Sequence, residues 1–270
     1  MFEQAEGVGI VIHSSTDIRR LRAAGRAAAA TLRAVAQRLR PGISTAQVNQ
    51  WVRADTLARG GIPSQFGHEG FPACVCTSRN HVACHGIPSP REILSEGDIL
   101  NVDITTLLDG FHGDTSETFF IGQPGPEARH VVEVARQCRD LGIGCVRDGA
   151  RLGDIGAVIS EFAHAQGCSV VREFTGHGIG RQMHAAPSVP HVGVRGTGTR
   201  LRTGMALTIE PIINLGAPDV VMGEDGWTVF TKDGSWSAQF EHTLVVTRRG
   251  CEILTCVDSP RTGERLSGNR

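Results

Sequence analysis

The residues best suited to chemistry begin with two acids, Asp103 and Asp114, on either side of the sequence Leu108-Asp109-Gly110-Phe111. An Asp-Gly pair between apolar runs is typical of a two-residue hairpin turn. In such a hairpin residue 105 pairs with Asp114, and Asp103 lies two residues further along. The two carboxylates then share one face as diagonal neighbours, about 7–8 Å apart at the backbone. They would repel each other, and a divalent cation between them would remove that cost.

Three further residues with metal-binding side chains lie in the second half of the chain. His177 stands in the glycine-rich run 176–180, Glu210 ends an apolar run before Pro211, and Glu241 lies in the apolar run 238–246. A carboxylate in so apolar a strand needs a partner. For each acid alone an arginine is an equally good partner, because the chain has 27 lysines and arginines, of which only Lys232 is lysine.

The five residues together predict a site for two metal ions. Four carboxylates and one imidazole suit Mn, Fe(II), Co or Zn, and a set of this size suits two ions better than one. Two ions about 3.5–4 Å apart can share a bridging water and lower its pKa towards neutrality. The chemistry that this arrangement favours is hydrolysis.

Helices and strands must position these side chains, and the apolar periodicity predicts where they lie. Apolar residues from Ile18 to Leu39 recur at steps of three and four, which predicts a helix that begins near Ser14, Ser15 or Asp17 and ends at Pro41-Gly42. Further helices are predicted at 45–59, 127–146 and 152–166. Strands are predicted at 73–77, 98–107, 111–121, 169–175, 205–214, 227–231, 237–247 and 252–255.

The two halves of the chain share local sequence at a single offset. Residues 40–44 resemble 147–151, and residues 96–103 resemble 203–210, both at an offset of 107. One offset at two distant points indicates duplication of a helix-helix-strands unit. The duplication places Asp103 and Glu210 at the same point of each half. We therefore predict one catalytic domain over 1–270 with internal pseudo-symmetry, an N-terminal tail at 1–14 and a C-terminal tail at 256–270.

Composition excludes several classes of protein. With 270 residues, 40% of them hydrophobic, the chain can bury a sizeable core, and its net charge of −1 gives no indication of nucleic-acid binding. No run of about 18 apolar residues predicts a membrane span, and the acidic N-terminus does not resemble a secretory signal. The eight cysteines contain no C-x-x-C pair and are too sparse for a disulfide scaffold. We expect reduced thiols in a cytoplasmic protein.

From about Ser15 to Thr255 the sequence resembles bacterial methionine aminopeptidases in order, spacing and flanking residues. The matching motifs are Cys84-His85-Gly86-Ile87-Pro88, Asn101-Val102-Asp103-Ile104, Gly110-Phe111-His112-Gly113-Asp114-Thr115-Ser116, Gly176-His177-Gly178-Ile179-Gly180, Thr208-Ile209-Glu210-Pro211 and Gln239-Phe240-Glu241-His242-Thr243.

This resemblance implies the α/β "pita-bread" fold, in which two pseudo-two-fold-related helix-helix-strands halves surround a curved antiparallel sheet. It also implies removal of the initiator methionine from new proteins when the second residue is small. Only 33 residues separate His177 from Glu210, too few for the helical insertion of type II enzymes, and no Cys/His-rich extension precedes the motifs. The chain therefore resembles the short type I form.

The resemblance assigns a role to each metal-binding residue. Asp103 is expected to hold one ion, His177 and Glu210 to hold the other, and Asp114 and Glu241 to bridge the two. The two divalent ions would be Co, Mn, Fe(II), Zn or Ni.

The resemblance also assigns catalytic and substrate-binding residues. His85 and His184 are expected to contact the scissile amide, and Glu210 to accept a proton from the attacking water. The methionine pocket is expected to comprise Phe71, Cys76, Met183 and Trp227, which suit an unbranched thioether. Gln65 and His68 depart from the family pattern, which more usually has a cysteine and an aromatic residue there.

Two alternatives remain at the level of sequence. A proline-specific aminopeptidase or dipeptidase has the same ligands, and a non-catalytic peptide-binding relative has the same fold. The expected partners are nascent polypeptide N-termini, with the ribosome as a candidate. Neither a membrane nor sequence-specific nucleic acid is expected to bind, and the chain is expected to be a monomer.

Overall fold

The computed structural model describes residues 9–256, and helix-capping residues set where its two N-terminal helices begin. Helix α1 spans Ser15–Ala36 and α2 spans Thr45–Ala58. The Ser14 side chain accepts a hydrogen bond from the Asp17 N–H, and the Asp17 carboxylate accepts one from the Ser14 N–H, which forms a capping box. Ser44 and Gln47 form the same box at α2.

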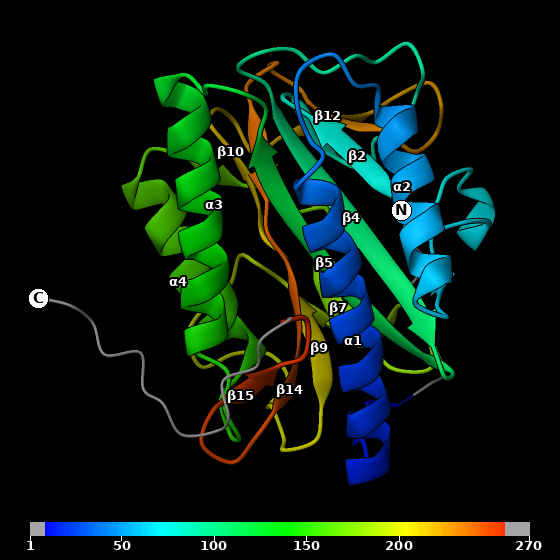
Figure 1. Cartoon of the computed structure of the whole chain (residues 1–270). Coiled ribbons are helices and arrows are strands. Elements are labelled where there is room, and N and C mark those ends of the chain that lie inside the picture. Colours follow the sequence, from blue (N-terminus) through cyan, green and yellow to red (C-terminus); the bar gives the residue numbers. More distant parts are fainter. Residues whose placement is uncertain (1–8, 257–270) are drawn as a thin grey trace, which may run out of the picture.

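The second half repeats the helix pair. Helix α3 spans Pro126–Gly144, with proline in its first turn, and α4 spans Leu152–Ala165. Both ends of α4 lie 107 residues after the corresponding ends of α2. In Figure 1, α1 and α3 run along the same side of the strands, with α2 beside α1 and α4 beside α3.

The strands are β1 Ile62–Pro63, β2 Cys76–Arg79, β3 Val82–Cys84, β4 Ile99–Leu108, β5 Phe111–Phe120, β6 Ser169–Val170, β7 Gly176–Gly178, β8 Ala185–Val189, β9 Ala206–Ile209, β10 Ile212–Asn214, β11 Val220–Met222, β12 Val229–Thr231, β13 Ser237–Gln239, β14 His242–Val246 and β15 Cys251–Ile253.

Strands β4 and β5 form the predicted hairpin with the predicted register. Thr105 is opposite Asp114, and Leu108 is opposite Phe111. Asp109 and Gly110 both have positive φ, 49° and 75°, as a primed two-residue turn requires. On its other edge β4 pairs with β1 and β2, and Cys76 of β2 is opposite Asp103.

Two of the predicted strands are each broken in two. The run 205–214 divides into β9 and β10 around Glu210-Pro211, and 237–247 divides into β13 and β14 around Phe240-Glu241. The prediction of continuous strands was wrong here. Pro211 has no N–H for a strand ladder, and the Glu241 N–H donates to the Ser116 carbonyl of β5 and not to the facing strand. β9 pairs with β14 and β10 pairs with β13 in one common register, so the two breaks face each other.

Several other strand predictions need correction. β2 begins three residues later than predicted, β6 ends at Val170, and β12 begins at Val229. Gly176–Gly178 forms a strand, β7, where the glycine content indicated a loop. The short strands β1, β3, β8 and β11 were not predicted, because segments of two to five residues show little periodicity.

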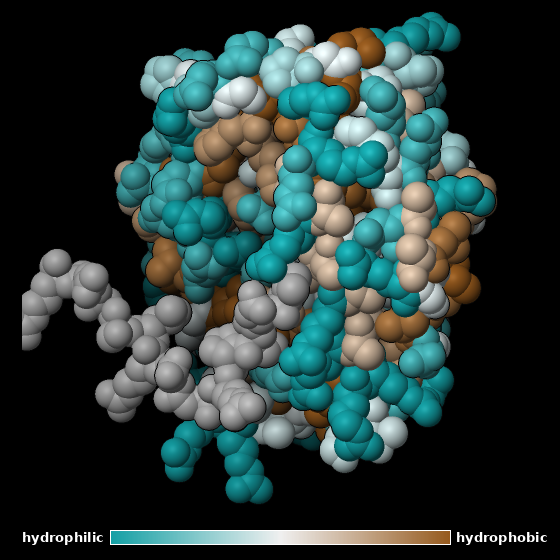
Figure 2. Space-filling view, in the orientation of Figure 1, coloured by the Kyte–Doolittle hydropathy of each residue, from teal (hydrophilic) through white to brown (hydrophobic). Residues whose placement is uncertain are grey.

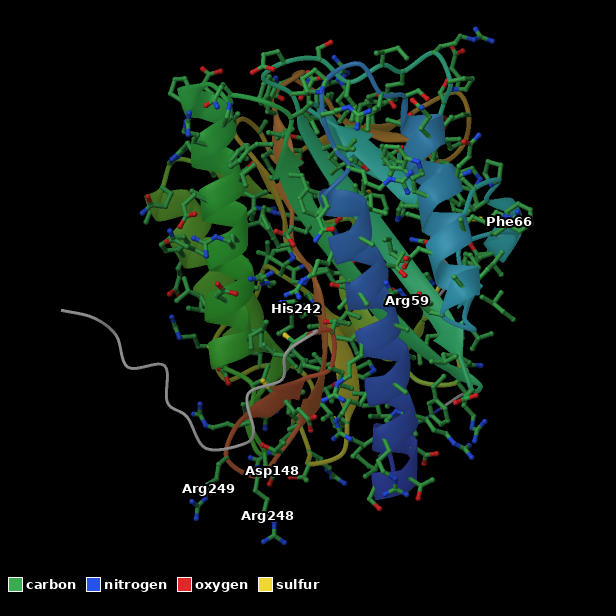
Figure 3. The ribbon with its side chains drawn as sticks, viewed as in Figure 1. Arg59, Phe66, Asp148, His242, Arg248 and Arg249 are labelled. Carbon is green, nitrogen blue, oxygen red and sulfur yellow. The ribbon has the colours of Figure 1, made fainter. Side chains whose placement is uncertain are left out.

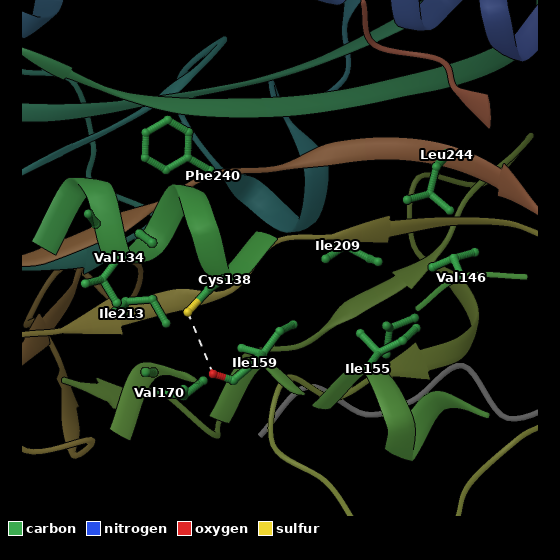
Figure 4. Packing of buried hydrophobic residues seen from close by; sticks show 14 of the residues in the cluster. Val134, Cys138, Val146, Ile155, Ile159, Val170, Ile209, Ile213, Phe240 and Leu244 are labelled. Carbon is green, nitrogen blue, oxygen red and sulfur yellow. Dashed lines mark hydrogen bonds between the residues drawn. The ribbon is translucent and has the colours of Figure 1, made fainter. Parts of the chain in front are cut away.

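Each half buries its strands beneath its own helix pair. In the second half Cys138 of α3 and Ile159 of α4 pack with Ile209 and Ile213 of the strands in one apolar cluster (Figure 4). A smaller cluster joins α1 and α2 to β4. Hydrophilic side chains cover most of the outer face of the helices in Figure 2, with hydrophobic ones visible between α1 and α3.

Helix α1 lies on β5 with almost no space between their backbones. A Cβ atom at Gly113 would lie 2.3 Å from the backbone nitrogen of Gly25. Only glycine permits so close an approach. The face of β5 opposite to the one that carries Asp114 is thereby held against α1.

The described chain ends are also packed. His13, within the predicted N-terminal tail, is buried, and its backbone N–H donates to the Gly204 carbonyl at 2.8 Å. The rest of both predicted tails, residues 1–8 and 257–270, lies outside the described residues. Between residues 9 and 256 we find no helix long and apolar enough to cross a membrane.

Candidate active site

The fold brings the five predicted metal-binding residues together. Asp103 comes from β4, Asp114 from β5 and His177 from β7, while Glu210 and Glu241 stand in the two facing strand breaks. One ligand atom from each of Asp114, His177 and Glu241 lies within 4.8 Å of the others. His177 Nε2 is 3.5 Å from Glu210 Oε1 and 3.8 Å from Asp114 Oδ2. Asp103 is close enough to Asp114 for their charges to interact strongly.

Hydrogen bonds fix the orientation and tautomer of His177. Its Nδ1 lies 3.0 Å from the Gly178 carbonyl, which can only accept, so Nδ1 carries the proton. Its backbone N–H donates to Thr208 Oγ1 at 3.0 Å. Burial lowers the pKa of His177 to about 4, so the ring is neutral near pH 7. The unprotonated Nε2 therefore stands between two carboxylates, an arrangement that is favourable around a cation.

The four carboxyl groups resist ionisation in the absence of a cation. Burial, followed by repulsion from Asp114, raises the pKa of Asp103 well above its usual range. Burial and neighbouring carboxylates do the same for the pKa values of Glu210 and Glu241. Burial raises the pKa of Asp114 to about 7, although Thr105 Oγ1 donates to Asp114 Oδ1 at 2.7 Å.

One buried oxygen of this cluster has no hydrogen-bond partner among residues 9–256. It is Oε1 of Glu241, a residue only 2% exposed. A buried acceptor without a donor is costly, and a bound cation would satisfy it. This atom, the neutral His177 and the four carboxylates fit divalent metal ions as ligands.

Two more histidines, His184 and His85, lie near the cluster. The ring centroid of His184 lies 4.4 Å from that of His177. His85 packs edge-on against Phe174 at 5.2 Å, and its φ of 56° is rare for a residue other than glycine. Burial lowers the pKa of His85 to about 4, and burial with neighbouring histidines lowers the pKa of His184 to about 2. Both rings are therefore neutral at pH 7 and can each donate one N–H.

Three of the four predicted pocket residues pack together beside His85. Phe71 and Cys76 are buried in one small apolar cluster with Trp227 against it, and the Phe71 and Trp227 rings are 5.1 Å apart. His85 is 6.4 Å from the Trp227 ring. Met183 is buried but does not belong to this cluster.

The structure adds residues whose site contacts the sequence did not predict. Gln65 donates to Asp103, Thr208 Oγ1 donates to Glu210 Oε1 at 2.6 Å, and His68 packs edge-on against His184 at 5.2 Å. The only sequence signal for Gln65 and His68 was their departure from the family pattern. Thr208 carried a weaker signal as a hydroxyl two residues before a ligand acid.

Comparison with known proteins decides the family. The sequence pattern of metallopeptidase family M24 matches residues 19–248. The chain belongs to metallopeptidase family M24. An M24 peptidase uses divalent metal, in agreement with the donor set described above, and the duplicated halves form the pita-bread fold.

Three relatives indicate where in M24 this chain lies. It is 51% identical to methionine aminopeptidase A of Synechocystis sp. over 249 residues, 92% of this chain and 98% of that protein. The crystal structure of methionine aminopeptidase from Rickettsia prowazekii superimposes with a TM-score of 0.90 at 44% identity, covering 92% of this chain and 100% of that one. A Xaa-Pro dipeptidase from Bacillus anthracis shares only the M24 fold, at 21% identity and a TM-score of 0.73, covering 93% of this chain and 62% of that one.

Proposed function

We propose that this M24 metallopeptidase is a methionine aminopeptidase that removes the initiator methionine from new polypeptide chains whose second residue is small. The observation that carries the proposal is the buried cluster of four carboxylates and a neutral imidazole beside two further neutral histidines and an apolar pocket. The high identity to methionine aminopeptidases over nearly their whole length supports the choice within the family.

We propose two divalent ions, held as the sequence analysis assigned them. Asp103 would hold one ion, His177 and Glu210 the other, and Asp114 and Glu241 would bridge. When bound, such ions lower the pKa of water and polarise a carbonyl group. The ions are Co, Mn, Fe(II), Zn or Ni.

The chain's own groups supply the remaining chemistry. Glu210 would accept the proton of the attacking water, because a carboxylate placed beside that water can act as a general base. His184 stays neutral and can donate an N–H to the carbonyl oxygen as negative charge develops there. His85 can donate to the leaving amide nitrogen. Phe71, Cys76 and Trp227, with Met183, which directly precedes His184 in the chain, would receive the methionine side chain.

The substrate partners are nascent polypeptide N-termini in the cytoplasm, with the enzyme acting as a monomer.

The ribosome is a candidate partner, and one basic surface suits RNA binding. Arg200, Arg202 and Arg248 line one open cavity with Asp148, and Figure 3 shows Arg248 and Arg249 extending outward from the turn between β14 and β15. Arginine binds RNA phosphates in a salt-dependent way. Co-sedimentation with ribosomes should fall in the double variant Arg248→Ser/Arg249→Ser if this surface is used.

The decisive experiment compares the tripeptides Met-Ala-Ser and Met-Phe-Ser. We expect free methionine from Met-Ala-Ser only, loss of activity with a chelator and recovery when a divalent metal is added back. An Ala-Pro-Ser peptide tests the proline-specific alternative. Cleavage of that peptide in preference to Met-Ala-Ser would contradict the proposal, and absence of all cleavage and of metal binding would favour the non-catalytic alternative.

A further inference from the structure

A buried glutamine lies against one of the proposed metal ligands. Gln65 is 7% exposed, and its Nε2 lies 2.9 Å from the backbone oxygen of Asp103 and 3.4 Å from Asp103 Oδ1. On the other side of the amide, Oε1 accepts a hydrogen bond from the Thr105 N–H at 3.3 Å. One carboxamide therefore holds the β4 backbone at Asp103 and at Thr105 and also reaches the Asp103 carboxylate.

The other half of the molecule has the same two amide N–H contacts at the equivalent acid. Gln239 Nε2 lies 3.3 Å from the backbone oxygen of Glu210 and 3.4 Å from Glu210 Oε2. Glu210 lies 107 residues after Asp103, the offset of the duplication. The two glutamines are not at that offset, so each half reaches the same arrangement from a different segment: the loop before β2 for Gln65, and β13 for Gln239.

We propose that Gln65 and Gln239 are matched positioning residues, each of which orients the carboxylate of one non-bridging metal ligand. Gln65 serves Asp103 and Gln239 serves Glu210, so each glutamine controls one of the two metal positions. This inference rests on the proposed dinuclear site. The family more usually has a cysteine at position 65, and a thiol offers only one weak donor. On this inference the change from cysteine to Gln65 is a functional substitution.

The chemistry of an amide suits this task. Each carboxylate oxygen has two lone pairs, so an oxygen that accepts one hydrogen bond still has a lone pair for a metal ion, and the hydrogen bond fixes its orientation. An amide is neutral, so it donates without adding a positive charge that would repel the cation. Arginine or lysine at the same place would compete with the metal for the carboxylate.

The test replaces each amide with a side chain of similar volume that cannot donate. Gln65→Met and Gln239→Met are prepared metal-free, and Mn²⁺ binding is measured by calorimetry. Loss of such an outer contact typically weakens metal affinity by about 10–100-fold. We expect Gln65→Met to weaken one of the two Mn²⁺-binding steps by this factor and Gln239→Met to weaken the other. The visible spectrum of each Co²⁺-loaded variant should change, because the ligand geometry changes. Gln50→Met, at an exposed position of α2, is the matched control and should leave both steps and the spectrum unchanged.

The outcomes separate this inference from the proposed function. If the wild-type chain binds neither Mn²⁺ nor Co²⁺, the metal site itself is wrong, and the inference is overturned with it. If the wild type binds two ions and Gln65→Met leaves both affinities and the Co²⁺ spectrum unchanged, Gln65 has only a structural role and the inference alone is overturned. Should Gln65→Met fail to fold, Gln65→Asn, whose amide is one methylene shorter, should show the same loss of affinity in one step.

Discussion

At the scale of single residues, Glu241 has the most demanding environment in the site. Its Oε1 is buried without a hydrogen-bond partner in the described part of the chain, and its pKa is raised by burial and by three neighbouring carboxylates. A buried carboxylate that lacks a hydrogen-bond donor and resists ionisation destabilises the fold, and a role as a metal ligand best explains it. The facing strand breaks place it there opposite Glu210.

Replacing Glu241 with glutamine should therefore remove function and spare the fold. We expect Glu241→Gln to lower metal-dependent cleavage of Met-Ala-Ser by more than about 100-fold, beyond the usual cost of losing an outer contact of a metal site. Metal content by atomic absorption should fall with it. Glu117→Gln, at an exposed position of β5, is the control. Full metal content and activity in Glu241→Gln would remove this residue from the site.

A second residue-scale prediction separates catalysis from metal binding. His184→Ala should keep its metal and slow turnover by about 10²-fold or more, the usual cost of losing a donor to a developing oxyanion. His184 contacts the His177 ring without being one of the proposed ligands. Turnover number and metal content are measured on the same preparation. A parallel fall in both would mean that His184 is itself a ligand.

At the scale of elements, the packing of α1 on β5 determines how the hairpin with Asp103 and Asp114 is held. Gly113 is one residue before Asp114 and lies against Gly25 of α1. Any side chain at residue 113 must push the helix away from the strand. Stability and ligand geometry are therefore coupled at this contact.

Gly113→Ala should destabilise the protein by about 1–3 kcal/mol or more, the usual cost of overpacking. The midpoint of urea unfolding measures this. Gly144→Ala is the matched control, because a Cβ there meets no atom within 4 Å and alanine favours the helix. Its stability should stay the same or rise slightly. Equal midpoints for the two variants would show that α1 can shift without cost.

At the scale of the whole molecule, the buried carboxylates link folding to pH and to metal. The pKa values of these carboxyl groups are raised in the folded state. The stability that they contribute is therefore fully present below their ordinary pKa, and it is lost as the pH rises through the folded-state pKa. The buried histidines have lowered pKa values, so the stability that they contribute is lost as the pH falls below their ordinary pKa of 6.5. Above pH 6.5 the carboxylates dominate.

The metal-free protein should therefore lose thermal stability between pH 6.5 and pH 8. A divalent metal should raise the Tm at both pH values, and more at pH 8, where the carboxylates would otherwise be ionised and unpaired. Scanning calorimetry with and without Mn²⁺ measures this. The pH dependence should be weaker in metal-free Asp103→Asn, which has one fewer of these carboxyl groups. A metal-free Tm that rises over this interval would contradict the raised pKa values.

The sequence by itself determined the elements whose signals are local. The start of the first helix near Ser14, the Asp109-Gly110 turn and the register of β4 with β5 all depend on neighbouring residues, and the structure has them as local chemistry requires. The offset of 107 predicted the duplication, because related halves keep related spacing. Resemblance to a known family predicted which acids and histidines would meet.

Only the tertiary structure decided how the remaining parts of the site are built. The breaks at Glu210 and Glu241 lie inside apolar runs that read as continuous strands, and they form where Pro211 lacks an N–H and where the Glu241 N–H donates to Ser116 of β5. The contact between Gln65 and Asp103 joins residues 38 apart, and that between Gln239 and Glu210 joins residues 29 apart. Periodicity reports which face of an element is buried, but it carries no information about which distant side chain lies there. The packing of distant segments within each half supplies it.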